Sequence, residues 1–141
     1  MAEVTEIFDN SILYEDVIDT FFEIQLDLKN EGNELTFTTD ELYLFDSFRA
    51  ICQQYRSMQQ LKMQNIDSYN KLLPNFISNI EKLNDAIKSD VFEQSHFENI
   101  NEIIFERFNN AKKDYVEFID DFTEYMSEFL NSVLETLHDD L

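Results

Sequence analysis

The sequence predicts a mainly α-helical fold: an elongated antiparallel bundle of three or four helices, with a small β-hairpin between the first and second helices. The 141 residues include one glycine and one proline, so few positions interrupt a helix. Apolar side chains recur every three or four residues along most of the chain. Apolar residues make up 43% of the sequence, enough for one core, and we expect a single domain over residues 1–141.

The first helix is expected over about residues 10–22. It follows Asn10 and Ser11, which are typical helix-capping residues. Its apolar positions are Ile12, Leu13, Tyr14, Val17, Ile18, Phe21 and Phe22. Their spacing places them on one side of a helix, which is therefore the side expected to face the core.

The apolar pattern then changes, because the segments FEIQLDL and ELTFT alternate apolar and polar residues on either side of the single glycine. This alternation predicts a hairpin over about residues 22–38. An isolated two-stranded hairpin is marginal in water, so we expect it to cover one end of the bundle. Two alternatives remain: a strand that adds to the sheet of a partner, and a first helix that continues through this segment.

A second helix is expected to begin at a capping box, in which Thr38 is the cap and Glu41 lies three residues later. Its apolar stripe has the spacings of antiparallel helix packing. The stripe comprises Leu44, Phe48, Ile51, Tyr55, Met58, Leu61, Ile66, Tyr69, Leu73, Phe76, Ile80, Leu83 and Ile87. Proline inside a helix removes a backbone hydrogen bond and clashes with the preceding turn, so we expect a kink or break near residue 74.

A second capping box begins at Ser95, and the last helix is expected over about residues 96–138. Its apolar stripe comprises Ile100, Ile104, Phe108, Ala111, Tyr115, Phe118, Phe122, Tyr125, Phe129, Val133 and Leu137. We interpret this stripe as core and not as the lining of a ligand site. At 1.5 Å per residue the helix would span roughly 65 Å, so it must project or be covered by both halves of the preceding helix.

Charge is distributed unevenly along the chain. Thirty acidic and ten basic residues give a net charge of −20, which disfavours direct binding to nucleic acid or to an anionic membrane. Residues 49–88 hold six bases and three acids, whereas the segments on either side are strongly acidic. We interpret the basic segment as internal charge complementarity within the bundle, and we expect the external partner to be a protein with a basic surface.

The residue types do not predict an enzyme. A single glycine leaves no phosphate-binding loop, and the lone Cys52 has no histidine near it in sequence. The pairs Glu93-x-x-His96 and Glu135-x-x-His138 resemble part of a dimetal ligand set. On one helix, however, the two histidines would lie about 63 Å apart. We therefore expect no catalytic residue, no cofactor and no metal.

The sequence predicts a cytoplasmic protein. The first residues are acidic and lack the apolar run of a signal peptide. No stretch approaches the ~18 consecutive apolar residues of a membrane span. A single cysteine cannot form an internal disulfide, which agrees with a reducing compartment.

Residues 114–141 hold nine acidic residues and no lysine or arginine. On a helical projection most of these acids cluster within about 80°, well away from the apolar stripe, with Asp120 at the edge of the cluster. The candidate partner-binding residues are Asp114, Glu117, Asp120, Asp121, Glu124, Glu128 and Glu135. They would present carboxylates at roughly 5 Å intervals, on the order of the phosphate spacing in nucleic acid. Such an array suits a basic groove that holds DNA or RNA.

We interpret the chain as a non-enzymatic acidic inhibitor, a nucleic-acid mimic that occupies a basic site on a nucleic-acid-binding protein. In composition it is similar to the small acidic helical proteins with which phages and mobile elements block such enzymes. Two alternatives remain. The acidity serves solubility alone, or the chain is a structural or escort protein that pairs through its apolar helical seam. A chaperone, an immunity protein and a homodimeric scaffold are examples of the second class.

Overall fold

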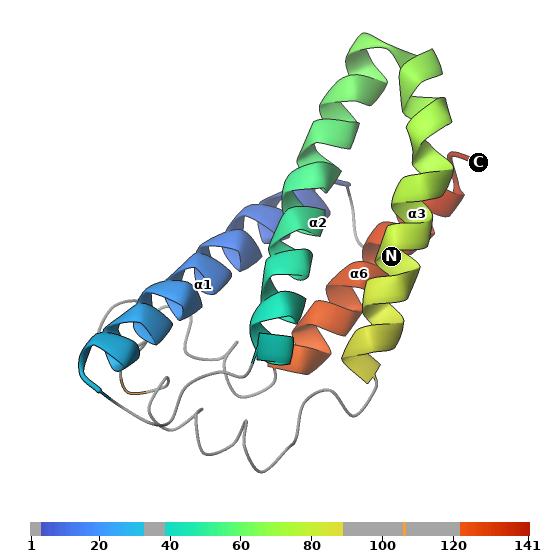
Figure 1. Cartoon of the computed structure of the whole chain (residues 1–141). Helices are drawn as coiled ribbons and strands as arrows, with labels where there is room; N and C mark the ends of the chain where they lie inside the picture. Colours follow the sequence, from blue (N-terminus) through green and yellow to red (C-terminus); the bar gives the residue numbers. More distant parts are fainter. Residues whose placement is uncertain (1–3, 33–38, 89–105, 107–121) are drawn as a thin grey trace.

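The computed structural model describes residues 4–32, 39–88, 106 and 122–141, and within these ranges it contains helices and no strand (Figure 1). The helices are α1 (Val4–Asn30), α2 (Thr39–Gln64), α3 (Ile66–Lys88) and α6 (Phe122–His138). The predicted mainly α-helical, bundle-like architecture is thus confirmed for the described part of the chain, which contains no hairpin. None of its helices is both long enough and apolar enough to cross a bilayer.

The four helices pack in a ring, in which each one makes its main contacts with two others. Contacts join α1 to α2, α2 to α3, α3 to α6 and α6 back to α1. Neighbouring helices in this ring run in opposite directions, and α2 and α3 extend together beyond the other two (Figure 1). Apolar side chains from all four helices form one cluster in the middle.

An aromatic triangle lies within this cluster. The Tyr14 ring of α1, the Phe48 ring of α2 and the Phe129 ring of α6 have centroid separations of 5.3 to 5.8 Å and tilted or edge-on geometry. Such pairs contribute about 0.5–1.5 kcal/mol each beyond the burial of their area. Because Phe129, Val133 and Leu137 are all buried and the partly buried Tyr125 packs against the same core cluster, the prediction that the last apolar stripe is core is confirmed at these positions.

The predicted strand at residues 22–28 is wrong, because α1 continues through this segment to Asn30. Ile24 and Leu28 are buried, whereas Leu26 is 60% exposed. Residues four apart lie on the same side of a helix and also on the same face of a strand, so two of the three alternating residues fit either structure. Of the two alternatives, the continued first helix is the correct one for this segment.

The end of α1 is set by the single glycine. Gly32 has φ 73°, a left-handed conformation that a residue without a Cβ adopts at little cost. Its N–H donates to the carbonyl of Lys29 at 3.0 Å, and the N–H of Glu31 donates to the carbonyl of Asp27 at 3.0 Å. These bonds satisfy carbonyls in the last turn of the helix. The second predicted strand, ELTFT, falls on residues 34–38, outside the described residues.

The chain reverses at Asn65, between α2 and α3, and not near residue 74. Asn65 Oδ1 accepts a hydrogen bond from the N–H of Ser68 at 3.2 Å, so Asn65 caps the first turn of α3. Helix α3 runs through Pro74 without a break between helices. Proline leaves the carbonyl four residues earlier, that of Asn70, without its helical donor. Both residues are exposed, so water has access to that carbonyl.

Candidate functional site

Helix α6 turns its apolar side to the core and an acidic side to solvent. Three of the seven candidate residues, Glu124, Glu128 and Glu135, lie on α6, and all three are exposed. The other four lie outside the described residues, namely Asp114, Glu117, Asp120 and Asp121. The structure thus describes only the final part of the helix that was expected over 96–138.

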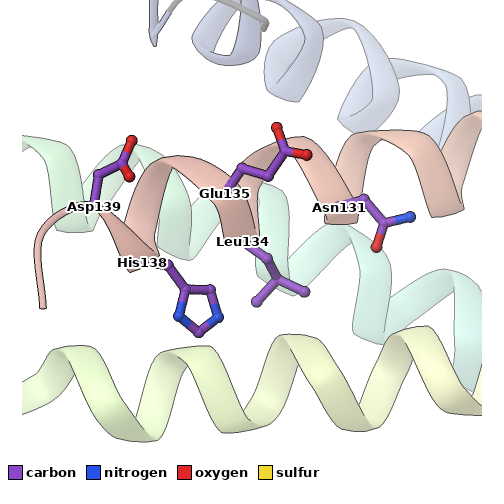
Figure 2. Close-up of a pocket in the computed structure, with 5 residues that line it drawn as sticks. All are labelled: Asn131, Leu134, Glu135, His138 and Asp139. Atoms are coloured by element: carbon purple, nitrogen blue, oxygen red, sulfur yellow. The ribbon is translucent and has the colours of Figure 1, made fainter.

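Asp139, just after the end of α6, extends the row of acids. At about 100° per residue, Glu124, Glu128, Glu135 and Asp139 fall within roughly 60° of one another around the helix axis. We call these four residues the acidic strip. In Figure 2, Glu135 and Asp139 project to the side on which α1 lies, whereas Leu134 and His138 point toward α3. Asp139 was missing from the predicted site, although its position on the helical projection was visible in the sequence.

A shallow groove of about 660 Å³ lies beside the strip, lined by Asn131, Leu134, Glu135, His138 and Asp139 (Figure 2). The Glu135 carboxylate and the His138 ring point to opposite sides of α6. They therefore do not converge on one metal ion. No group of three or more metal-ligating side chains gathers anywhere in the described ranges, and Glu93 and His96 lie outside these ranges.

The basic residues of α2 are paired within the bundle. Arg49 donates to Asp19 of α1 at 2.8 Å and to Asp46 on its own helix at 2.5 Å. Farther along α2, Arg56 forms an ion pair with Glu15, and Lys62 forms one with Asp140 at 2.9 Å. For these three of the six bases in residues 49–88, the arrangement matches the internal charge complementarity inferred from the sequence.

The pairing of Glu15 is reflected in its pKa. Partial burial alone would raise the pKa of this carboxyl group, but hydrogen bonds from Arg56 and Gln53 and the positive charge of Arg56 outweigh burial and lower it. The Gln53 bond is 3.1 Å long. Glu15 is therefore held ionised by donors on α2.

The acidic strip differs from Glu15 in having no such partner. Among the described residues, no ion pair joins Glu124, Glu128, Glu135 or Asp139 to a lysine or arginine. Glu128 still affects the interior, because the pKa of Tyr14 is raised first by burial and then by the charges of Tyr125 and Glu128. The four side chains of the strip are exposed to solvent. Glu135 and Asp139 lie at the edge of α6 that borders α1 (Figure 2).

Helix α1 adds acids on the adjoining side. Asp9, Glu23 and Asp27 are exposed and lie roughly 80–120° around α1 from Glu15, which faces α2. Since α1 packs between α2 and α6, these acids lie on the side of α1 away from the basic residues of α2. The exposed acids of α1 and the acidic strip of α6 thus lie on two helices that contact each other.

Comparisons with known protein families, with curated proteins and with solved structures gave no match for this chain.

Proposed function

We propose that this chain is a non-enzymatic protein that occupies a basic site on a nucleic-acid-binding protein, and that the acidic strip of α6 is its contact surface. The observation that carries the proposal is the contrast in pairing. The described acids that face α2 have basic partners, whereas those of the strip are exposed and have none within the described part of the chain. Carboxylates of one sign repel one another, and a basic partner would remove that repulsion.

The density of charge sets how well the strip imitates nucleic acid. Glu124 and Asp139 lie roughly 22 Å apart along the helix axis, so the four carboxylates occur about every 7 Å. One DNA strand carries a phosphate about every 3.4 Å. The strip alone supplies about half of that density, and the exposed acids of α1 supply more. Binding is therefore expected to use both helices and to depend steeply on salt.

Capture experiments test the proposal directly. The immobilised chain is incubated with cell lysate, washed at about 50 and 200 mM salt, and then eluted with duplex DNA. We expect retained proteins to bind nucleic acid, to dissociate at the higher salt and to be displaced by the duplex. Retention that is insensitive to both salt and duplex would contradict the proposal.

A charge-matched pair of variants separates the strip from net charge. The variant Glu124→Lys with Glu128→Lys should lose capture. The variant Asp67→Lys with Glu81→Lys changes the net charge equally on exposed sites of α3 and should keep it. Equal loss in both variants would show that total charge, and not the strip, is responsible. Unchanged circular dichroism would verify that both variants remain folded.

The runner-up is a structural or escort role, including a homodimer, through the apolar seam. On α6 this seam is inside the bundle, because Phe129 is 4% exposed and Leu137 is fully buried. Pairing through it would require α6 to leave the core. Exposed apolar side chains lie elsewhere: Phe8 and Met63 line a groove of about 1030 Å³ between the start of α1 and the end of α2. Light scattering that shows a salt-insensitive dimer would favour this second function.

A further inference from the structure

Asp140, near the end of the described chain, contacts the last turn of α2 and the first turn of α3. Asp140 lies beyond the last residue of α6, and its carboxylate accepts hydrogen bonds from two side chains. Lys62 Nζ donates to Oδ1 and to Oδ2 at 2.9 Å each, and Tyr69 Oη donates to Oδ2 at 2.6 Å. Burial alone would raise the pKa of Asp140, but the bonds from Tyr69 and Lys62 outweigh it and lower the pKa. Asp140 is thus held as an anion.

A further buried donor on α2, the Tyr55 hydroxyl, is unused within the described part of the chain. Tyr55 is fully buried, and its hydroxyl has no hydrogen-bond partner among the described residues. The pKa of Tyr55 is raised to about 12, first by burial and then by the charge of Asp140, so the hydroxyl keeps its proton near that charge. One helical turn later, the buried Nε2 of Gln59 also lacks a partner within the described ranges. Unsatisfied buried donors are costly, and an acceptor that reached the Tyr55 hydroxyl would remove that cost.

We infer that Lys62, Tyr69 and Tyr55 form a carboxylate-binding site at the α2–α3 end, which the chain's own Asp140 fills and which an external carboxylate can fill in its place. A carboxylate has about four acceptor positions. Asp140 is tethered to α6 and accepts three hydrogen bonds, none of them from Tyr55. A carboxylate without this tether is free to shift and to accept a hydrogen bond from the Tyr55 hydroxyl as well.

The site is also open enough for exchange. The side chains of Lys62 and Asp140 are 38% and 20% exposed, whereas Tyr55 and Tyr69 are fully buried. One cation and neutral hydroxyl donors match a single negative charge on two oxygens. This inference does not depend on the acidic strip, because none of the site's residues belongs to it.

Chemical rescue tests the site. The variant Asp140→Ala removes the resident carboxylate, and its thermal midpoint Tm should fall by several degrees. Sodium formate should then raise the Tm of Asp140→Ala in a saturable manner, and more than sodium chloride does at the same ionic strength. The unmodified chain should show a much smaller difference between formate and chloride, because formate must compete with Asp140 for the site. The control Asp139→Ala removes an exposed neighbouring acid and should respond as the unmodified chain does.

Two further variants sharpen the test. Adding Tyr55→Phe to Asp140→Ala should reduce the formate-specific rise in Tm, because one of the proposed donors is lost. Asp140→Asn keeps the side-chain size without the charge and is measured if Asp140→Ala does not fold. An equal response of folded Asp140→Ala to formate and chloride, or of Asp140→Asn where it is measured instead, would overturn the proposal.

A capped acidic tripeptide, acetyl-Gly-Asp-Leu-amide, identifies the source of the carboxylate. A rise in the Tm of Asp140→Ala with both formate and the tripeptide supports a site that accepts an acidic side chain of another chain. A rise with formate alone supports a site for small free carboxylates. The same peptide with Asn in place of Asp should have no effect, and an equal effect of the two peptides would contradict carboxylate recognition.

Discussion

Helices α1 and α6 are both acidic on their outer sides, but their carboxylates meet different neighbours. On α1, Glu15 and Asp19 face Arg56 and Arg49 of α2. On α6, Glu135 and Asp139 project toward the side on which α1 lies, and within the described part of the chain no lysine or arginine pairs with the acidic strip. A run of acids therefore has no fixed role. The residues on the adjacent helix decide whether each acid stabilises the bundle or remains available to a partner.

The largest effect is expected from the inner side of α6. Phe129→Ala removes a ring that contacts both Tyr14 and Phe48, and it should lower the free energy of unfolding by about 3–5 kcal/mol. Urea unfolding followed by circular dichroism measures this loss. The same deletion at Phe8, which is 37% exposed, serves as the control and should cost about 1 kcal/mol or less. Similar losses at the two sites would show that α6 is not an integral part of the core.

An intermediate effect is expected where α1 meets α2. Arg56→Met leaves Glu15 without its ion pair, and Ser11 Oγ without its 3.1 Å bond from Arg56. The free energy of unfolding should fall by about 1–2 kcal/mol, less than for a fully buried pair because both side chains are partly exposed. Arg49→Met breaks a more exposed pair, since the Asp19 side chain is 50% exposed, and it should cost less. A larger loss of unfolding free energy for Arg49→Met than for Arg56→Met would contradict this prediction.

The same pair predicts a dependence on pH. The folded-state pKa of Glu15 lies below the ordinary value of 4.5. Its ionised form therefore contributes stability that is fully present above about pH 4.5 and is lost as the pH falls through the lowered pKa. Urea unfolding between about pH 7 and pH 3 should show the stability gap between the unmodified chain and Arg56→Met narrowing as the pH falls. A gap that stays constant down to pH 3 would exclude Glu15 as the cause.

The smallest effect, of opposite sign, is expected on the acidic strip. Glu128→Lys replaces a repulsive pair with Glu124 by an attractive one in the favourable order. It should raise the free energy of unfolding by about 0.3–0.5 kcal/mol, and the gain should shrink at high salt. Urea unfolding at low and high salt checks both statements. A loss above about 1 kcal/mol would mean that Glu128 has a structural partner and is not available for binding.

The sequence was sufficient where periodicity and burial agree. The inward stripe of α6 was predicted from its spacing. Phe129, Val133 and Leu137 of this stripe are buried, because a helix with one apolar side packs that side against the core. The segment around Leu26 was misread, because an exposed leucine between two buried residues completes an alternating pattern. Asn65 was missed as the turn, although the apolar spacing widens from Leu61 to Ile66 and an asparagine lies between them.

Contacts between distant residues were beyond sequence reasoning. The segment that holds Arg49, Arg56 and Lys62 was predicted to be neutralised internally, but the sequence did not indicate which acid each base would meet. In the sequence, Asp140 is one of nine acids in residues 114–141, and nothing beside it indicates a partner. Its bonds with Lys62 and Tyr69 depend on the relative position of three helices along the bundle axis, which no local pattern encodes.

The aromatic triangle has a consequence for the order of folding. Its Tyr14 and Phe48 belong to helices that are close in sequence, so α1, α2 and α3 can associate through short chain closures. Phe129 joins them only after a long stretch of chain has been brought round, which carries the largest loss of chain entropy. We therefore expect α6 to dock last. Until α6 docks, a chain emerging from the ribosome would expose the apolar sides of α1, α2 and α3 that α6 later covers. Aggregation or binding of a chaperone at these apolar sides would then compete with completion of the bundle.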